Sequence, residues 1–198
     1  KIMLHHEISG NGKKPLVLLH GFMENTTIWD EMEAHLSKDF TLIKIDLPGH
    51  GKSKVYQEIH TVELMAEKVK EVIDALKLEK INLLGHSLGG YVSLAFAEKF
   101  PEILESMTLF FSTTVADDDE KKQIRRRSIA VIDENFETFV KTSIPNLFSN
   151  NEKDILEGKI ELAKNIAKST NKEGVKAAQL GMAERPDRTE ILENLDAK

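Results

Sequence analysis

The five residues Gly85-His86-Ser87-Leu88-Gly89 have a pattern that suits nucleophilic chemistry. A serine hydroxyl attacks an acyl carbon when a neighbouring base takes its proton. A serine exposed on a sharp turn between a strand and a helix has a strained backbone, so small residues must flank it. Gly85 and Gly89 are those small residues. We therefore interpret Ser87 as a catalytic nucleophile.

The pattern alone fits an ordinary glycine-rich turn equally well, because three small residues at this spacing recur by chance. The surrounding sequence favours the catalytic interpretation. An upstream apolar run, Leu16-Val17-Leu18-Leu19, ends in His20-Gly21-Phe22. The backbone N–H groups of Phe22 and Leu88 are expected to form an oxyanion hole for a tetrahedral intermediate.

Alternating strand and helix signals over residues 1–113 indicate how these groups are positioned. Strands are expected at 16–19, 41–45, 81–84 and 107–111, and helices at 27–38, 62–77 and 88–99. Strands that alternate with helices predict an α/β fold, a mostly parallel sheet with helices on both faces. Residues 1–113 are thus expected to be the core.

Only helical signals continue beyond the core. They cover residues 118–132, 134–148, 152–168 and 172–184. This predicts an inserted helical cap over 114–185, after which 186–198 return toward the core. Most apolar side chains of the cap should pack it, and a few should line a cleft above Ser87, which favours a substrate with an apolar portion. These side chains are Ile124, Ile129, Ile132, Phe136, Phe139, Val140, Ile144, Leu147 and Phe148.

Three motifs together resemble the cap-bearing α/β-hydrolase superfamily: His20-Gly21-Phe22, Asp46-Leu47-Pro48-Gly49-His50-Gly51-Lys52-Ser53 and Gly85-His86-Ser87-Leu88-Gly89-Gly90. The chain is most similar there to small carboxylesterases, such as pimeloyl-ACP methyl ester esterases and enol-lactonases. The resemblance implies an α/β-hydrolase fold and a serine hydrolase that cleaves a carboxylic ester through an acyl-enzyme. It also implies that the 46–53 loop is structural. We expect His20 to be a scaffold group and neither His20 nor His86 to be the base.

The family also uses an acid and a histidine, which follow the serine in the chain. All seven histidines here precede Ser87. The triad acid and histidine are therefore expected beyond Lys198, in about 60 further residues, and the 198 residues alone are expected to be inactive. The alternative is a complete chain with a degenerate site. Asp117 is the best internal acid, but it looks more like an N-terminal charge of the first cap helix.

Two other functions remain open. One is a carbon–carbon hydrolase or lyase of the same fold, similar to the menaquinone-pathway synthase or to meta-cleavage product hydrolases. The other is a hydrolase-fold binding protein without turnover. Arg125-Arg126-Arg127 would suit a substrate carboxylate, although a solvated helix face is the expectation we favour.

The composition of the chain limits the classes of partner and cofactor that we expect. The net charge of -6 argues against a nucleic-acid surface. Without cysteines there is no disulfide or thiolate metal site, and neither clustered histidines nor ligand-spaced carboxylates appear. No apolar run approaches the ~20 residues of a membrane span, and the first residues lack the apolar segment of a signal peptide. We expect a cytoplasmic protein with a small-molecule acyl substrate, no cofactor, no metal, and no membrane partner.

Overall fold

A five-stranded sheet forms the centre of the computed structural model, which describes residues 2–198. The strands lie in the order β1-β3-β2-β4-β5. They are β1 His6–Ser9, β2 Lys14–Leu19, β3 Phe40–Ile45, β4 Ile81–His86 and β5 Leu104–Phe110. Strands β3, β2, β4 and β5 are parallel, and β1 pairs with β3 in the antiparallel direction. The predicted mostly parallel sheet is confirmed.

The sequence does not predict β1. Its four residues include one aliphatic side chain, Ile8, which is 52% exposed. An edge strand with so little burial has no apolar run and no clear alternation, the two signals by which strands are found. Pairing with β3, rather than the composition of the segment, therefore makes it a strand.

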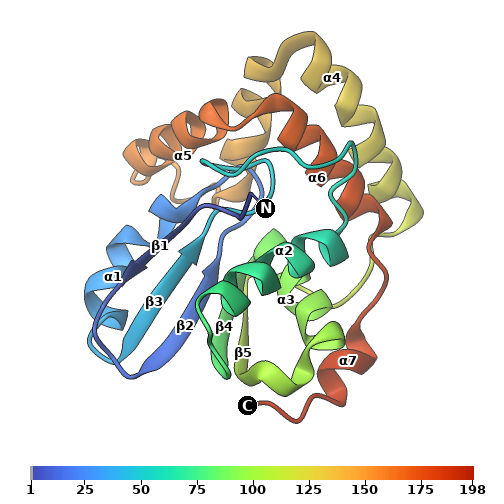
Figure 1. Ribbon diagram of the computed structural model, residues 1–198. Helices are drawn as coiled ribbons and strands as arrows, with labels where there is room; N and C mark the ends of the chain where they lie inside the picture. The colour runs from blue at the N-terminus through green and yellow to red at the C-terminus, as the bar shows by residue number, and fades with distance from the viewer. Residues whose placement is uncertain (1) are drawn as a thin grey trace.

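Helices cover both faces of the sheet, as predicted (Figure 1). Val17 and Leu19 of β2 face one apolar cluster, which includes the buried sides of α2 (Val62–Ala75) and α3 (Leu88–Lys99). Leu16 and Leu18 face another cluster with Trp29, next to α1 (Asp30–Leu36). A 3₁₀ turn, Thr26–Trp29, leads into α1. Successive residues of a strand point to opposite faces, so a continuous apolar run packs in both directions.

A further group of helices gathers at the upper end of the view in Figure 1. It comprises α4 (Asp119–Ser143), a 3₁₀ turn (Ile144–Leu147), α5 (Glu157–Ser169) and α6 (Lys172–Glu184). We call these the covering helices. They share an apolar cluster that includes Ile132, Phe139, Val140 and Ile144, and α4 packs against both α5 and α6.

The boundaries within the covering helices differ from those expected. The predicted break near Asp133 lies at Asn135, whose φ of −155° and ψ of 86° interrupt α4. The Asn135 side chain accepts a hydrogen bond from the Thr138 amide, as a helix cap does. The predicted helix at 152–168 begins only at Glu157, after a series of turns.

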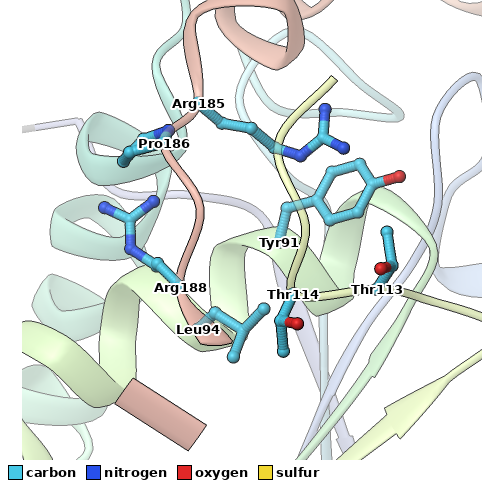
Figure 2. A pocket seen from close by; sticks show the side chains of 7 residues that line it. All are labelled: Tyr91, Leu94, Thr113, Thr114, Arg185, Pro186 and Arg188. Carbon is cyan, nitrogen blue, oxygen red and sulfur yellow. The ribbon is translucent and has the colours of Figure 1, made fainter. Parts of the chain in front are cut away.

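Two arginines fix the segment that follows α6 (Figure 2). The Arg185 guanidinium lies 3.8 Å from the centre of the Tyr91 ring. Arg188 bonds Glu98 of α3 at 2.8 Å and Glu63 of α2 at 2.5 Å. The space between the residues in Figure 2 is a tightly filled junction rather than a binding cavity.

The last residues of the chain reach the sheet. After α7 (Thr189–Glu193), the Lys198 amide donates to the Glu105 carbonyl at 3.1 Å, and the Lys198 carbonyl accepts from the Met107 amide at 2.9 Å. The end of this segment therefore lies next to β5. Across residues 2–198, no helix has both the length and the apolar character needed to cross a membrane.

Candidate active site

Ser87 lies directly after β4 and occupies the N-cap position of α3, where its side chain makes no capping hydrogen bond. Its φ of 50° and ψ of −113° put a non-glycine residue in a region that costs free energy. Two neighbouring groups hold this conformation. The Ser87 amide donates to the Phe110 carbonyl at 3.0 Å, and the Ser112 hydroxyl donates to the Ser87 carbonyl at 2.9 Å. The end of β5 thus supports the strained turn.

The glycines around Ser87 allow backbones to touch. A Cβ on Gly85 would collide with the carbonyl of Gly89, and a Cβ on Gly89 would collide with the carbonyl of Leu19 in β2. A Cβ on Gly90 would meet the Ser112 side chain. The helix α3 therefore begins in direct contact with its neighbours, and only glycine fits at these positions.

Phe22 lies in the loop after β2, which reaches the same edge of the sheet as Ser87. In this loop Met23 has a positive φ of 58°, and its side chain is buried in the apolar cluster of the covering helices. The Glu24 carboxylate accepts the Gly21 amide at 2.5 Å and lies 2.9 Å from His86 Nδ1. The carboxyl ends of parallel strands thus bring the Phe22 loop, His86 and Ser87 together.

His20 is part of the scaffold, as expected. Its Nδ1 donates to the Gly21 carbonyl at 2.7 Å, and its Nε2 accepts the Leu47 amide at 2.9 Å. Burial lowers the pKa of His20 and holds the ring neutral. Burial and the nearby His20 also lower the pKa of His50, to about 3.

The loop of residues 46–53 is also structural. The Asp46 carboxylate accepts the amides of Thr26 and Lys52, each at 2.9 Å. The Ser53 hydroxyl donates to the Asp46 carbonyl at 2.6 Å. The polar side chains of Asp46 and Ser53 are therefore used to shape the turn after β3.

A cavity of about 700 Å³ opens beside Ser87. Phe22 and His86 contribute to one wall, and most of the remaining lining is apolar. The apolar residues from the covering helices, together with Phe148 directly after the 3₁₀ turn, are Ile144, Leu147, Phe148, Leu162, Ala163, Ile166 and Met182. Three of the cap residues expected over Ser87 are among them: Ile144, Leu147 and Phe148. The contribution of α5 was not foreseen.

The charged side chains that line the cavity have partners of opposite charge or hydrogen-bonding groups. Lys159 of α5 forms an ion pair with Glu31 of α1 across the cavity lining. Glu24 is bonded to His86, which is the one histidine among the cavity-lining residues of 2–198. The sequence analysis does not predict Glu24 or this pairing, because the partner His86 lies on a different strand.

Arg125 corrects one expectation. Only Arg126 and Arg127 of the basic run are exposed, whereas Arg125 lines the cavity. Its Nε bonds the Asp117 carboxylate at 2.5 Å, and its Nη1 bonds Gln179 at 3.0 Å. The solvated helix face is therefore wrong for Arg125, because a buried carboxylate draws it inward.

Asp117 corrects a second expectation. Asp118 caps α4, and Asp119 lies in its first turn, but the Asp117 side chain is buried between Arg125 and Arg185. Burial raises the pKa of Asp117, yet the hydrogen bonds and charges of the two arginines outweigh it, so the net shift is downward. Asp117 is an ion-pair centre rather than a helix-end charge.

Metal ligands do not gather in the part of the chain that the structure describes. Residues 2–198 contain no group of three or more histidine, cysteine or acidic side chains arranged to hold a metal ion.

Known proteins share this architecture. A thermophilic esterase from Thermogutta terrifontis, solved with malate bound, is 36% identical, with a TM-score of 0.92 over 98% of this chain and 72% of its own. The enol-lactonase from Burkholderia xenovorans LB400 is 21% identical, with a TM-score of 0.89 over 98% of this chain and 75% of its own, which shows the fold alone.

A similarity in sequence adds a third relative. The 2-hydroxy-6-oxononadienedioate/2-hydroxy-6-oxononatrienedioate hydrolase of Escherichia coli K12 is 34% identical over 113 residues, which are 54% of this chain and 39% of that protein. The chain spans only 30% of the length of other curated relatives that it matches. A family model described as alpha/beta hydrolase fold matches residues 14–155. The chain belongs to the alpha/beta hydrolase fold family.

Proposed function

We propose that this protein is a serine hydrolase that cleaves a carboxylic ester or related acyl substrate through an acyl-enzyme, with Ser87 as the nucleophile. The observation that carries the proposal is the position of Ser87. It has a strained, positive-φ backbone at the N-terminus of α3 and lines a cavity of about 700 Å³. Strain of this kind persists where the surrounding structure holds it, and it clusters at active sites.

In the proposed reaction, Ser87 Oγ forms a bond to the acyl carbon while its proton passes to a base. The resulting oxyanion accepts hydrogen bonds from the Phe22 and Leu88 amides, and the N-terminus of α3 adds a favourable field. The alcohol then leaves with a proton, and water attacks the acyl-enzyme to release the acid. Ser87 is regenerated at the end of the cycle.

The cavity supports a neutral substrate with an apolar acyl or ring portion. Its lining is mostly apolar, and Glu31 and Arg125 are already paired with Lys159 and Asp117. A substrate carboxylate would have to compete with Asp117 for Arg125. A neutral ester does not compete with Asp117. Burial of its apolar part in the cavity contributes a favourable free energy of about 25 cal/mol for each Å² of apolar surface removed from water.

Proton removal from Ser87 requires a base. His86 is the histidine that lines the cavity within residues 2–198, and its Nδ1 is engaged by Glu24. A carboxylate on Nδ1 leaves Nε2 as the atom that could take a proton. Among residues 2–198, however, no hydrogen bond joins His86 to the Ser87 hydroxyl, so we do not assign His86 as the base. We propose instead that the 198 residues alone give no turnover above background, since an unactivated hydroxyl is a poor nucleophile.

The second candidate is carbon–carbon bond hydrolysis. Two observations favour it: the similarity to the Escherichia coli hydrolase and the presence of Arg125 in the cavity wall. The substrate named for that enzyme is a dioate and so carries carboxylates. The pairing of Arg125 with Asp117 makes the ester the better candidate here.

Hydrolysis of p-nitrophenyl esters with acyl chains of 2, 4, 8 and 12 carbons (roughly the range that a cavity of this class admits) tests the proposal. We expect the full-length gene product to prefer a neutral, apolar acyl chain and the Ser87→Ala variant to be inactive. A dienedioate substrate assayed in parallel separates the second candidate. No turnover of either substrate class by the full-length product would favour a binding protein and reject both enzymes.

A further inference from the structure

Glu24 connects the loop after β2, which contains Phe22, to the end of β4, which precedes Ser87. Its carboxylate oxygen Oε2 accepts the Gly21 amide at 2.5 Å, at the start of the Phe22 loop. The same oxygen lies 2.9 Å from Nδ1 of His86, the residue directly before Ser87. One oxygen atom therefore connects the loop after β2 to the end of β4.

The fit around this oxygen is tight. A Cβ placed on Gly21 would lie 2.6 Å from Glu24 Oε2 and 2.9 Å from His86 Nδ1, closer than real Cβ contacts. The carboxylate, the glycine backbone and the imidazole thus occupy a space with no room for another side chain. A group held this closely fixes the relative positions of its neighbours.

The Phe22 loop needs such support. Met23, next in the chain, has a φ of 58°, which is costly for a residue with a side chain. Its side chain is buried in the apolar cluster of the covering helices. The Glu24 backbone amide donates to the Gly21 carbonyl at 3.2 Å, so the loop closes on itself as a turn. The carboxylate then ties this turn to His86.

We propose that Glu24 is a positioning residue that sets the Phe22 amide against Ser87 and the Leu88 amide. The inference rests on the proposed function, because it concerns the oxyanion donors of that reaction. Oε2 of Glu24 already forms hydrogen bonds with Gly21 and His86. Glu24 therefore acts through the length of its side chain and these hydrogen bonds rather than by taking a proton. Oxyanion donors must lie within hydrogen-bond distance of the position that the oxyanion takes in the transition state. A displacement of the Phe22 loop would move one donor away from that position and lower the rate of the chemical step.

Two substitutions of Glu24 separate the effect of side-chain length from the effect of side-chain charge. Glu24→Gln keeps the length of the side chain and an acceptor oxygen but removes the charge. Glu24→Asp keeps the charge but is one methylene shorter. In the full-length gene product, a positioning role predicts that Gln preserves kcat within about 3-fold. It predicts that Asp lowers kcat by about 10- to 100-fold with KM within about 2-fold, a smaller loss than that of an entire oxyanion donor. Glu58→Gln and Glu58→Asp, at an exposed position outside the cavity lining, are the matched controls.

Hydrogen exchange gives a readout independent of turnover. In the 198-residue chain, NMR should show the Gly21 amide exchanging at least about 10-fold faster in Glu24→Asp than in wild type, and unchanged in Glu24→Gln. Equal exchange in all three proteins overturns the positioning role. So does a kinetic pattern in which Asp retains activity and Gln loses it. If Ser87→Ala in the full-length gene product hydrolyses p-nitrophenyl butyrate as fast as the full-length wild type, the proposed function fails, and exchange alone decides the role of Glu24.

Discussion

Ser87 shows how backbone strain is kept at a single residue. A non-glycine residue in such a conformation costs about 1–3 kcal/mol, and hydrogen bonds with Phe110 and Ser112 hold it in place. The pattern of glycines reveals this turn in the sequence, because a Cβ at each of these positions would collide with neighbouring atoms. The same pattern does not reveal the role of Glu24, because its partner His86 lies on β4, far from the loop after β2 in the chain.

A substitution of Phe22 separates backbone from side-chain function. If the Phe22 amide is the oxyanion donor, Phe22→Leu keeps the amide and should lower kcat/KM of the full-length product by less than about 10-fold, whereas Ser87→Ala should lower it by at least about 10³-fold. Steady-state rates on p-nitrophenyl butyrate measure both. An equal loss in the two variants would argue against a backbone role for Phe22.

At the scale of the elements, buried ion pairs join the start of α4 to the end of α6. Asp117 lies just before α4 and receives Arg125 of α4 and Arg185 beyond α6. The alternation of strands and helices, the four parallel strands and the helical run after residue 114 follow from periodicity. The position of Asp117 does not, because Asp117, Asp118 and Asp119 are identical in type and only tertiary packing distinguishes them.

Removing the charge of Asp117 should destabilise the protein. Asp117→Asn leaves Arg125 and Arg185 without their carboxylate, and breaking a buried pair in this way costs about 3–5 kcal/mol. Asp118→Asn is the control, because asparagine caps a helix as well as aspartate does and Asp118 caps α4 through the Lys121 amide. Urea unfolding followed by circular dichroism measures both. Equal free energies of unfolding for the two variants would show that Asp117 has no special role.

Buried histidines influence the stability of the molecule as a whole. Burial lowers the pKa of His20, His50 and His60, with that of His50 falling to about 3. In the unfolded chain these groups titrate near a pKa of about 6.5. The unfolded state therefore binds more protons than the folded state below that pH, and stability present above it is lost as the pH falls.

This difference predicts the pH dependence of unfolding. Between pH 7.5 and pH 5, a histidine that stays neutral when folded costs up to about 2 kcal/mol, so the three together should lower the free energy of unfolding by about 2–6 kcal/mol. Urea titrations at both pH values measure the change. His50→Asn should reduce it, while the exposed control His35→Gln should not. A free energy of unfolding that is the same at both pH values would contradict the buried neutral histidines.

At the scale of the whole molecule, family membership, a fold built around parallel strands and a cavity beside Ser87 support the proposal of acyl transfer at that residue. Mass spectrometry of the full-length gene product, quenched within a single turnover of p-nitrophenyl butyrate, tests this most directly. We predict a butyryl group on the peptide that contains Ser87 and none on the Ser87→Ala protein. Butyrate released by the wild type without any acylated Ser87, or released equally by Ser87→Ala, would contradict the assignment.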